Sequence, residues 1–230
     1  MSSPLDDVGR TLPQYLTPQN ASQLADAIKK FPQQVQYYGP ASDADPWQGD
    51  VFSGVHGVRV NENGLEFYRS RFMTVSNTCD MAEENDRPHI PHVCLAPIAT
   101  VAAFTRLLVT NGIAKPRVDS LIAAMKQQQV TNVFYLPQGG GGPTEDLVVF
   151  LDALQSQTAD RFRASVEKKR EFSLSQVGWY LLLVKLAIHF CRAFEGQERQ
   201  PPVKQPPAAG SKAARSWTER MAAAWDALFA

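Results

Sequence analysis

Four side chains that could bind a metal or attack a substrate fall close together in the chain: Cys79, His89, His92 and Cys94. Thiolates and imidazoles bind zinc tetrahedrally, and ligands on either side of a loop can converge. Their spacing fits no zinc motif, because Cys79 has no neighbouring cysteine and one residue separates His92 from Cys94. We therefore predict no metal site and no cofactor. A thiol nucleophile at Cys79 is the other alternative, but free cysteines are usually buried and inert. The adjacent Asp80 is expected to cap a turn.

Two apolar runs, residues 72–76 and 93–98, flank this stretch and are predicted to be strands. Functional side chains often lie where a rigid strand ends. We therefore interpret Ser76, Asn77 and Asp80, which follow the first strand, as candidate binding residues.

The pattern of apolar and turn residues predicts the strands and helices around these two strands. A strand from residue 49 and a second from residue 65 flank an Asn-Gly turn at 61–64, which is a strong hairpin signal. Helices are predicted at 101–111 and 116–129, and strands at 133–137 and 147–151. The four glycines at 139–142 lack the Lys-Ser/Thr of a phosphate loop and indicate a flexible connection.

The two ends of the chain are predicted to be mostly helical. A helix is expected from Thr17 to Phe31, and another at 174–194 with Ser173 as its N-cap. Residues 167–170 are charged and indicate a solvated helix face, with RNA contact as the alternative. Proline-rich residues 197–213 read as a linker.

The last predicted helix, residues 216–229, places Trp217 and Trp225 on one face. An amphipathic helix on a tether either enters a groove of a partner protein or packs on its own domain. We interpret both tryptophans as binding residues. The domains expected are 1–48 (helix and coil), 49–155 (strand-rich), 156–196 (helical extension), the linker 197–213, and 214–230 (helix).

The composition is that of a globular protein with a sizeable core. Lys+Arg and Asp+Glu both number 23, so the formal net charge is zero, which excludes a strongly basic nucleic-acid coat protein. No signal-peptide pattern opens the chain, and its longest apolar run is too short to cross a bilayer. Three cysteines give no disulfide framework. A cytoplasmic protein without a membrane partner is the expectation.

The order of these features resembles the MazF/PemK type of toxin barrel over residues 49–155. The resemblance is carried by Gly49-Asp50-Val51, by Arg71 before a strand that ends at Ser76, and by the Pro-containing strand that ends at Thr100. It implies an α+β fold: a bent, antiparallel, SH3-like barrel with a helical insertion at 101–129. The chain departs from the pattern in the loop before Arg71 and at Ala99, which displaces Thr100.

The resemblance implies two functions. The first is a non-catalytic or weakly catalytic interaction module, with a protein partner or a second copy of the chain, in a prokaryotic stress or antiviral defence system. The alternative is a metal-independent endoribonuclease that cleaves single-stranded RNA. Arg71 would then be the acid or phosphate clamp, and the Thr100 hydroxyl would position the scissile phosphate. Against both stands a structural interpretation, in which Arg71 forms a surface ion pair and Thr100 caps the following helix.

Overall fold

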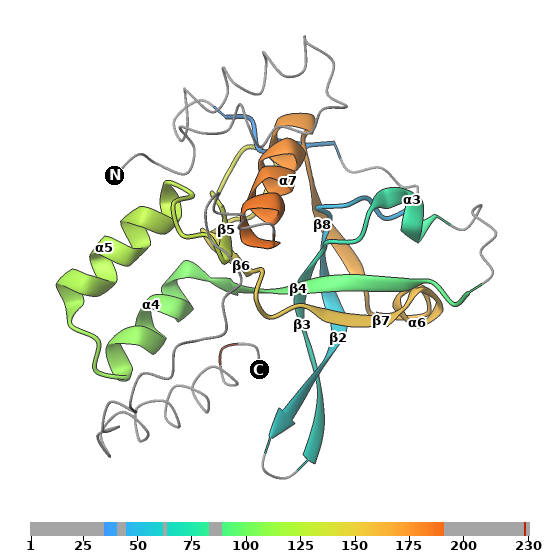
Figure 1. Cartoon of the computed structure of the whole chain (residues 1–230), viewed down its shortest axis with the longest axis horizontal. Helices are drawn as coiled ribbons and strands as arrows, with labels where there is room; N and C mark the ends of the chain where they lie inside the picture. The colour runs from blue at the N-terminus through green and yellow to red at the C-terminus, as the bar shows by residue number, and fades with distance from the viewer. Residues whose placement is uncertain (1–34, 41–44, 62–63, 83–88, 191–227, 229–230) are drawn as a thin grey trace, which may run out of the picture.

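The computed structural model describes residues 35–40, 45–61, 64–82, 89–190 and 228. Within these residues the fold is mixed α+β, as predicted, with an antiparallel sheet at its centre and helices around it (Figure 1). The strand order along the sheet is β1-β8-β2-β3-β4-β6-β5, and β7 pairs with β4 beside this path.

The predicted hairpin is present. Strands β2 (Val51–Asn61) and β3 (Gly64–Thr74) pair from Val51 opposite Met73 to Asn61 opposite Gly64. Gly64 has φ +114°, a conformation open to glycine and costly for other residues. A register shift between Phe52 and Val55 marks a bulge around Gly54. The outer part of this hairpin projects from the body of the molecule (Figure 1).

Strand β4 (His92–Thr100) joins the two halves of the sheet. Its first half pairs with β7 (Gln155–Thr158), and its last residues pair with β6 (Leu147–Phe150), which in turn pairs with β5 (Val133–Leu136). On its other side it pairs with β3. The described strands thus form an open, branched sheet and not a closed ring.

Strand β8 corrects the prediction for residues 167–174. The segment Lys169–Leu174 is a strand between β1 (Tyr38–Gly39) and β2, so the charged residues do not form a helix face. The burial rises toward Leu174, because this end inserts into the core beside β2. The predicted helical extension 156–196 is therefore helical only in part. It holds the short helix α6 (Ala159–Arg163) and the helix α7 (Gln176–Phe190).

The N-cap of α7 is Ser175 and not Ser173. The Ser175 hydroxyl oxygen accepts a hydrogen bond from the backbone N–H of Gly178 at 3.1 Å. Ser173 is buried within β8. The sequence contains both serines, and only the end of the strand decides which of them caps the helix.

The buried side chains of the described residues form three apolar clusters. Helix α7 packs over one cluster, and helices α4 (Val101–Thr110) and α5 (Lys115–Lys126) close another. Phe72, Leu95, Ile98, Phe134 and Leu136 are buried, and Val75 is partly buried.

Helix α7 is covered along most of its length. Leu182 is fully buried, and Trp179 and Leu186 are partly buried. Phe190, at the end of the helix, is 58% exposed. None of the helices among the described residues is long and apolar enough to cross a membrane.

Several predictions fall outside the described residues. These are the helix at 17–31, the linker 197–213, and the helix at 216–229 with Trp217 and Trp225. Leu228 alone is described from that last segment, and it packs on the cluster formed by α4, α5 and the neighbouring strands.

Candidate functional site

Arg71 and Thr100 line one open groove of about 360 Å³. Arg71 lies near the end of β3, and Thr100 is the last residue of β4. These strands pair, so two residues far apart in the sequence reach the same surface. We call this surface the Arg71–Thr100 groove. It is also lined by Ser53, Gly54, Arg69, Ser70, Ile98, Ala99, Ala103, Glu171 and Leu228.

The guanidinium of Arg71 forms an ion pair with Glu171 of β8, with 2.8 Å between Nε and Oε2. Both side chains are partly exposed in the groove. The carboxylate holds the guanidinium in place and offers a proton acceptor beside it. The ion pair expected from the structural interpretation is therefore present, and it lies inside the groove.

The hydroxyl of Thr100 caps helix α4. Its oxygen accepts a hydrogen bond from the backbone N–H of Ala103 at 3.0 Å. This cap confirms the structural interpretation of Thr100. The cap uses the hydroxyl oxygen as an acceptor, so the O–H remains able to donate to a ligand.

Sequence reasoning missed Arg69 and Glu171. Arg69 lies two residues before Arg71, forms an ion pair with Glu167, and donates from Nε to His56 Nε2 at 3.0 Å. Glu171 was missed because its segment was interpreted as a helix, which gives no reason to place it beside Arg71. Alternation in Phe172 and Leu174 was the available signal for a strand.

Ser76, Asn77 and Asp80 do not line the Arg71–Thr100 groove. The Ser76 hydroxyl oxygen accepts from the backbone N–H of Cys94 at 2.8 Å. Asn77 caps the short helix α3 (Thr78–Met81), its Oδ1 accepting from the N–H of Cys79 at 3.1 Å. Ser76 and Asn77 hold the end of β3 to β4 and to α3, so their hydrogen bonds are structural.

The cysteines and histidines considered as zinc ligands do not form a cluster. Among the described residues, no group of three or more His, Cys, Asp or Glu side chains could hold a metal ion. Cys79 is exposed in α3 and Cys94 is partly buried in β4, and neither forms a disulfide bond.

A second cleft, of about 290 Å³, lies where α7 meets the loop before β2. Asp50, 1% exposed, lies at its base and accepts from the backbone N–H of Trp47 at 2.9 Å. Its Oδ2 lies 3.0 Å from Nε of Arg170. Burial raises the pKa of Asp50, while the Trp47 N–H and Arg170 oppose the rise. Since Asp50 ties this loop to β8, its place in the Gly49-Asp50-Val51 motif has a structural explanation.

The chain matches no protein-family model and no curated protein.

Proposed function

We propose that this chain is a metal-independent endoribonuclease that acts on single-stranded RNA through the Arg71–Thr100 groove. The observation that supports the proposal is the convergence of Arg71, Thr100 and Glu171 from three strands on one open surface. The resemblance to MazF/PemK toxins implied two of these residues before their positions were known.

The three side chains match what cleavage by an internal 2′-hydroxyl requires. A base removes the 2′-hydroxyl proton, the 2′-oxygen bonds to phosphorus, and the bond to the 5′-oxygen breaks. In our proposal Glu171 accepts that proton, and Arg71 neutralises the charge that develops on the phosphate. The Thr100 hydroxyl donates to a phosphate oxygen and fixes its position. Water in the open groove protonates the departing 5′-oxygen.

The surrounding charges indicate slow turnover. Arg71 is paired with Glu171 and Arg69 with Glu167, so a phosphate must compete with these carboxylates. The whole chain has a formal net charge of zero, which provides little general attraction for RNA. Weak catalysis by a toxin-like groove, in a cytoplasmic stress or defence system, is the form of the proposal that fits these charges.

The test is incubation of the purified protein with mixed single-stranded RNAs in EDTA. We expect cleavage at defined positions, and a loss of at least about 100-fold in rate in Arg71→Ala, the scale of a lost transition-state contact. Glu171→Gln should lose cleavage while still binding RNA. The matched control is Arg117→Ala, which removes an exposed cation from α5, outside the groove. Cleavage undiminished in Arg71→Ala would exclude this groove.

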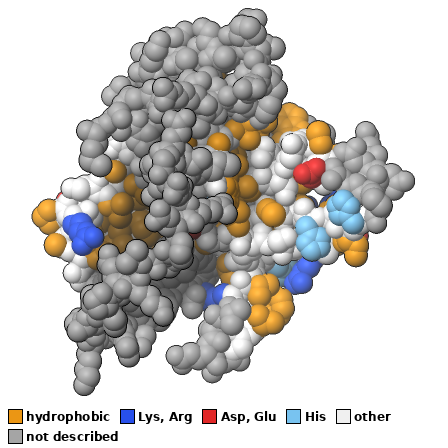
Figure 2. Space-filling model, viewed as in Figure 1, with side chains coloured by type: hydrophobic (Ala, Val, Ile, Leu, Met, Phe, Trp, Pro, Cys, Tyr) orange, Lys and Arg blue, Asp and Glu red, His pale blue; other side chains and the backbone are white. Residues whose placement is uncertain are grey.

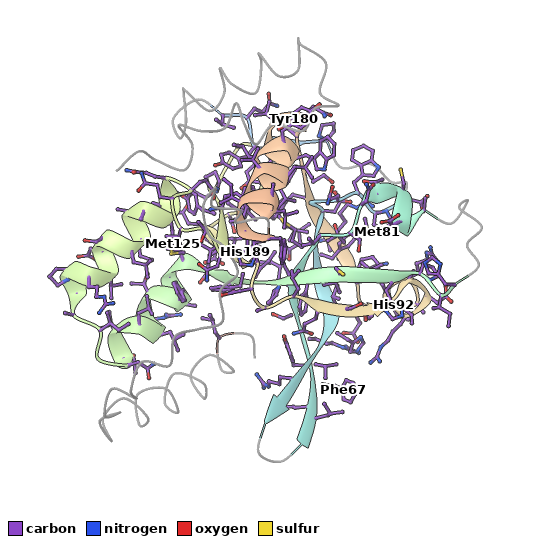
Figure 3. The ribbon with its side chains drawn as sticks, in the orientation of Figure 1. Phe67, Met81, His92, Met125, Tyr180 and His189 are labelled. Atoms are coloured by element: carbon purple, nitrogen blue, oxygen red, sulfur yellow. The ribbon has the colours of Figure 1, made fainter. Side chains whose placement is uncertain are left out.

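A second candidate function is an interaction module, and the projecting hairpin favours it. Leu65 and Phe67 are 67% and 58% exposed, and Val58 pairs directly with Phe67, so the three share one face. Figure 2 shows hydrophobic side chains on the hairpin, and Figure 3 shows Phe67 away from the body of the molecule. Exposed apolar surface of this kind marks contact sites. A second copy of the chain, or another protein, would cover this face.

A further inference from the structure

The gap between β2 and β7 is a cleft of about 470 Å³ whose side chains suit an anion. We call it the histidine cleft. It is lined by His56, Val58, His92, Leu95, Gln155, Ser156, Gln157, Thr158 and Arg161. This lining contains two imidazoles, one guanidinium, hydroxyls and amides, and it contains no carboxylate. Figure 2 shows histidine side chains on this face beside lysine or arginine side chains.

The two histidines come from different strands and are held by different partners. His92, at the start of β4, contacts the Ser156 hydroxyl of β7 through Nδ1 at 3.2 Å. Its Nε2 has no hydrogen-bond partner among the described residues. His56 of β2 receives the hydrogen bond from Arg69, which directs its other ring nitrogen to a proton-bearing, donating role. Figure 3 shows His92 at the α6 end of the sheet.

Arg161 supplies the positive charge of the cleft. Its guanidinium carbon lies 5.5 Å from the centre of the Phe67 ring, and no carboxylate pairs with it within the described ranges. The contrast with Arg69 and Arg71 is direct, because each of those has a glutamate partner. A guanidinium stacked on an aromatic ring keeps its N–H donors free for a phosphate.

We propose that the histidine cleft binds a phosphate group, carried either by a free nucleotide or by a nucleic-acid strand. Arg161 neutralises the charge, and His56 and His92 donate to the phosphate oxygens. The hydroxyl of Ser156 and the amide of Gln157 are further polar groups of the lining. Donors from three separate residues, Arg161, His56 and His92, match the tetrahedrally arranged oxygens of a phosphate better than the two coplanar oxygens of a carboxylate, so this lining favours phosphate.

This site does not rest on the ribonuclease proposal. The two surfaces meet at Arg69, which lines the Arg71–Thr100 groove and donates to His56 of the histidine cleft. A nucleic-acid strand that lies along both the groove and the cleft would place successive phosphates on either side of Arg69. A free nucleotide would occupy the histidine cleft alone.

The experiment is a titration of the isotopically labelled protein, followed through the imidazole resonances of its histidines. Inorganic phosphate is the probe, added at constant ionic strength against chloride. We expect the resonances of His56 and His92 to shift, and those of His89 to stay unchanged. In Arg161→Ala the affinity should fall about tenfold or more, the worth of one charged hydrogen bond. Arg106→Ala, an exposed cation on α4, is the matched control and should leave the affinity unchanged.

Two further probes separate the sources of the phosphate. Adenosine monophosphate that binds more tightly than phosphate identifies a nucleotide site. A short oligodeoxynucleotide that binds more tightly identifies a strand site, and it does so without cleavage, because it lacks the 2′-hydroxyl. The proposal is overturned if none of the three probes shifts His56 and His92, or if Arg161→Ala binds them as well as the unmodified protein. Loss of RNA cleavage in Arg71→Ala has no bearing on either result.

Discussion

Lys185 is a charged side chain in the interior, 2% exposed on helix α7. Its ammonium group donates to the carbonyl oxygens of Gln128 at 2.9 Å and Val130 at 2.5 Å, which follow the end of α5. Both carbonyls lie in the connection after α5 (Lys115–Lys126), and buried backbone carbonyls need hydrogen-bond donors, which the side chain of Lys185 supplies. Lys185 thereby links α7 to the connection between α5 and β5.

This link should make stability depend on pH. Burial lowers the pKa of Lys185 to about 7, below the value of about 10.4 for an exposed lysine. Between these two values the unfolded chain binds more protons than the folded one, so the free energy of unfolding should rise with pH across that window. The measurement is urea unfolding at pH 7, 8, 9 and 10. In Lys185→Met the rise contributed by this group should disappear.

Lys115→Met is the control for that series. Lys115 is exposed on α5 and pairs with Asp119 at its surface, so its removal should leave the pH dependence as it was. Equal slopes in Lys185→Met and the unmodified protein would show that Lys185 is charged and unperturbed in the folded state.

At the scale of single residues, the sequence predicted two residues of the groove, Arg71 and Thr100, but not the side chains that lie beside them. Arg71 and Thr100 were found through a strand-end pattern, and they do line one surface. Nothing local pointed to His56, and only the alternation in Phe172 and Leu174 pointed to the strand of Glu171, because the residues beside them in the fold come from distant parts of the chain. Ser76 and Asn77 have the residue types of a binding site, yet their hydrogen bonds hold β3 to β4 and cap α3.

At the scale of elements, the sequence predicted the hairpin and the two inserted helices correctly, but it missed strand β8. The Asn-Gly hairpin and the two inserted helices formed as predicted, since turn chemistry and helical periodicity are contained in a few consecutive residues. Strand β8 was missed because its charged start resembles a helix surface. Its pairing with β2 is a tertiary contact, and this contact overrides the helical preference of the charged residues.

The capping of α7 gives the test at this scale. Ser175→Ala should destabilise the protein by about 1–2 kcal/mol, because the N–H of Gly178 loses its acceptor and the carbonyl of Gln36 loses a donor. Ser120→Ala, on the exposed surface of α5, should change stability by less than about 0.5 kcal/mol. Chemical denaturation measures both. A Ser175→Ala variant as stable as Ser120→Ala would contradict the assignment of Ser175 as the N-cap.

At the scale of the whole molecule, the exposed face of the hairpin predicts association. If Val58, Leu65 and Phe67 form a contact between copies, the protein should be dimeric at high concentration, and Phe67→Ser should shift it toward monomer. Sedimentation velocity over a range of concentrations measures the shift. The control is Val109→Ser, which removes an exposed apolar side chain from α4. A protein that stays monomeric at every concentration would contradict a contact between copies. This face would then bind a different protein, and binding of that protein would have to depend on Phe67.

The position of β2 in the sheet also sets the order in which the chain can fold. Its one neighbour, β3, follows directly through a short turn, whereas its other neighbour, β8, lies near the end of the described chain, where Val51 pairs with Phe172. During synthesis the hairpin can therefore form early, while the β8 side of β2 stays unpaired until residues 169–174 have left the ribosome. Contacts between residues so distant in sequence slow folding. Until β8 is available, the unpaired edge of β2 can pair with a wrong strand. Nascent chains that end before residue 169 should consequently be the ones that chaperones retain.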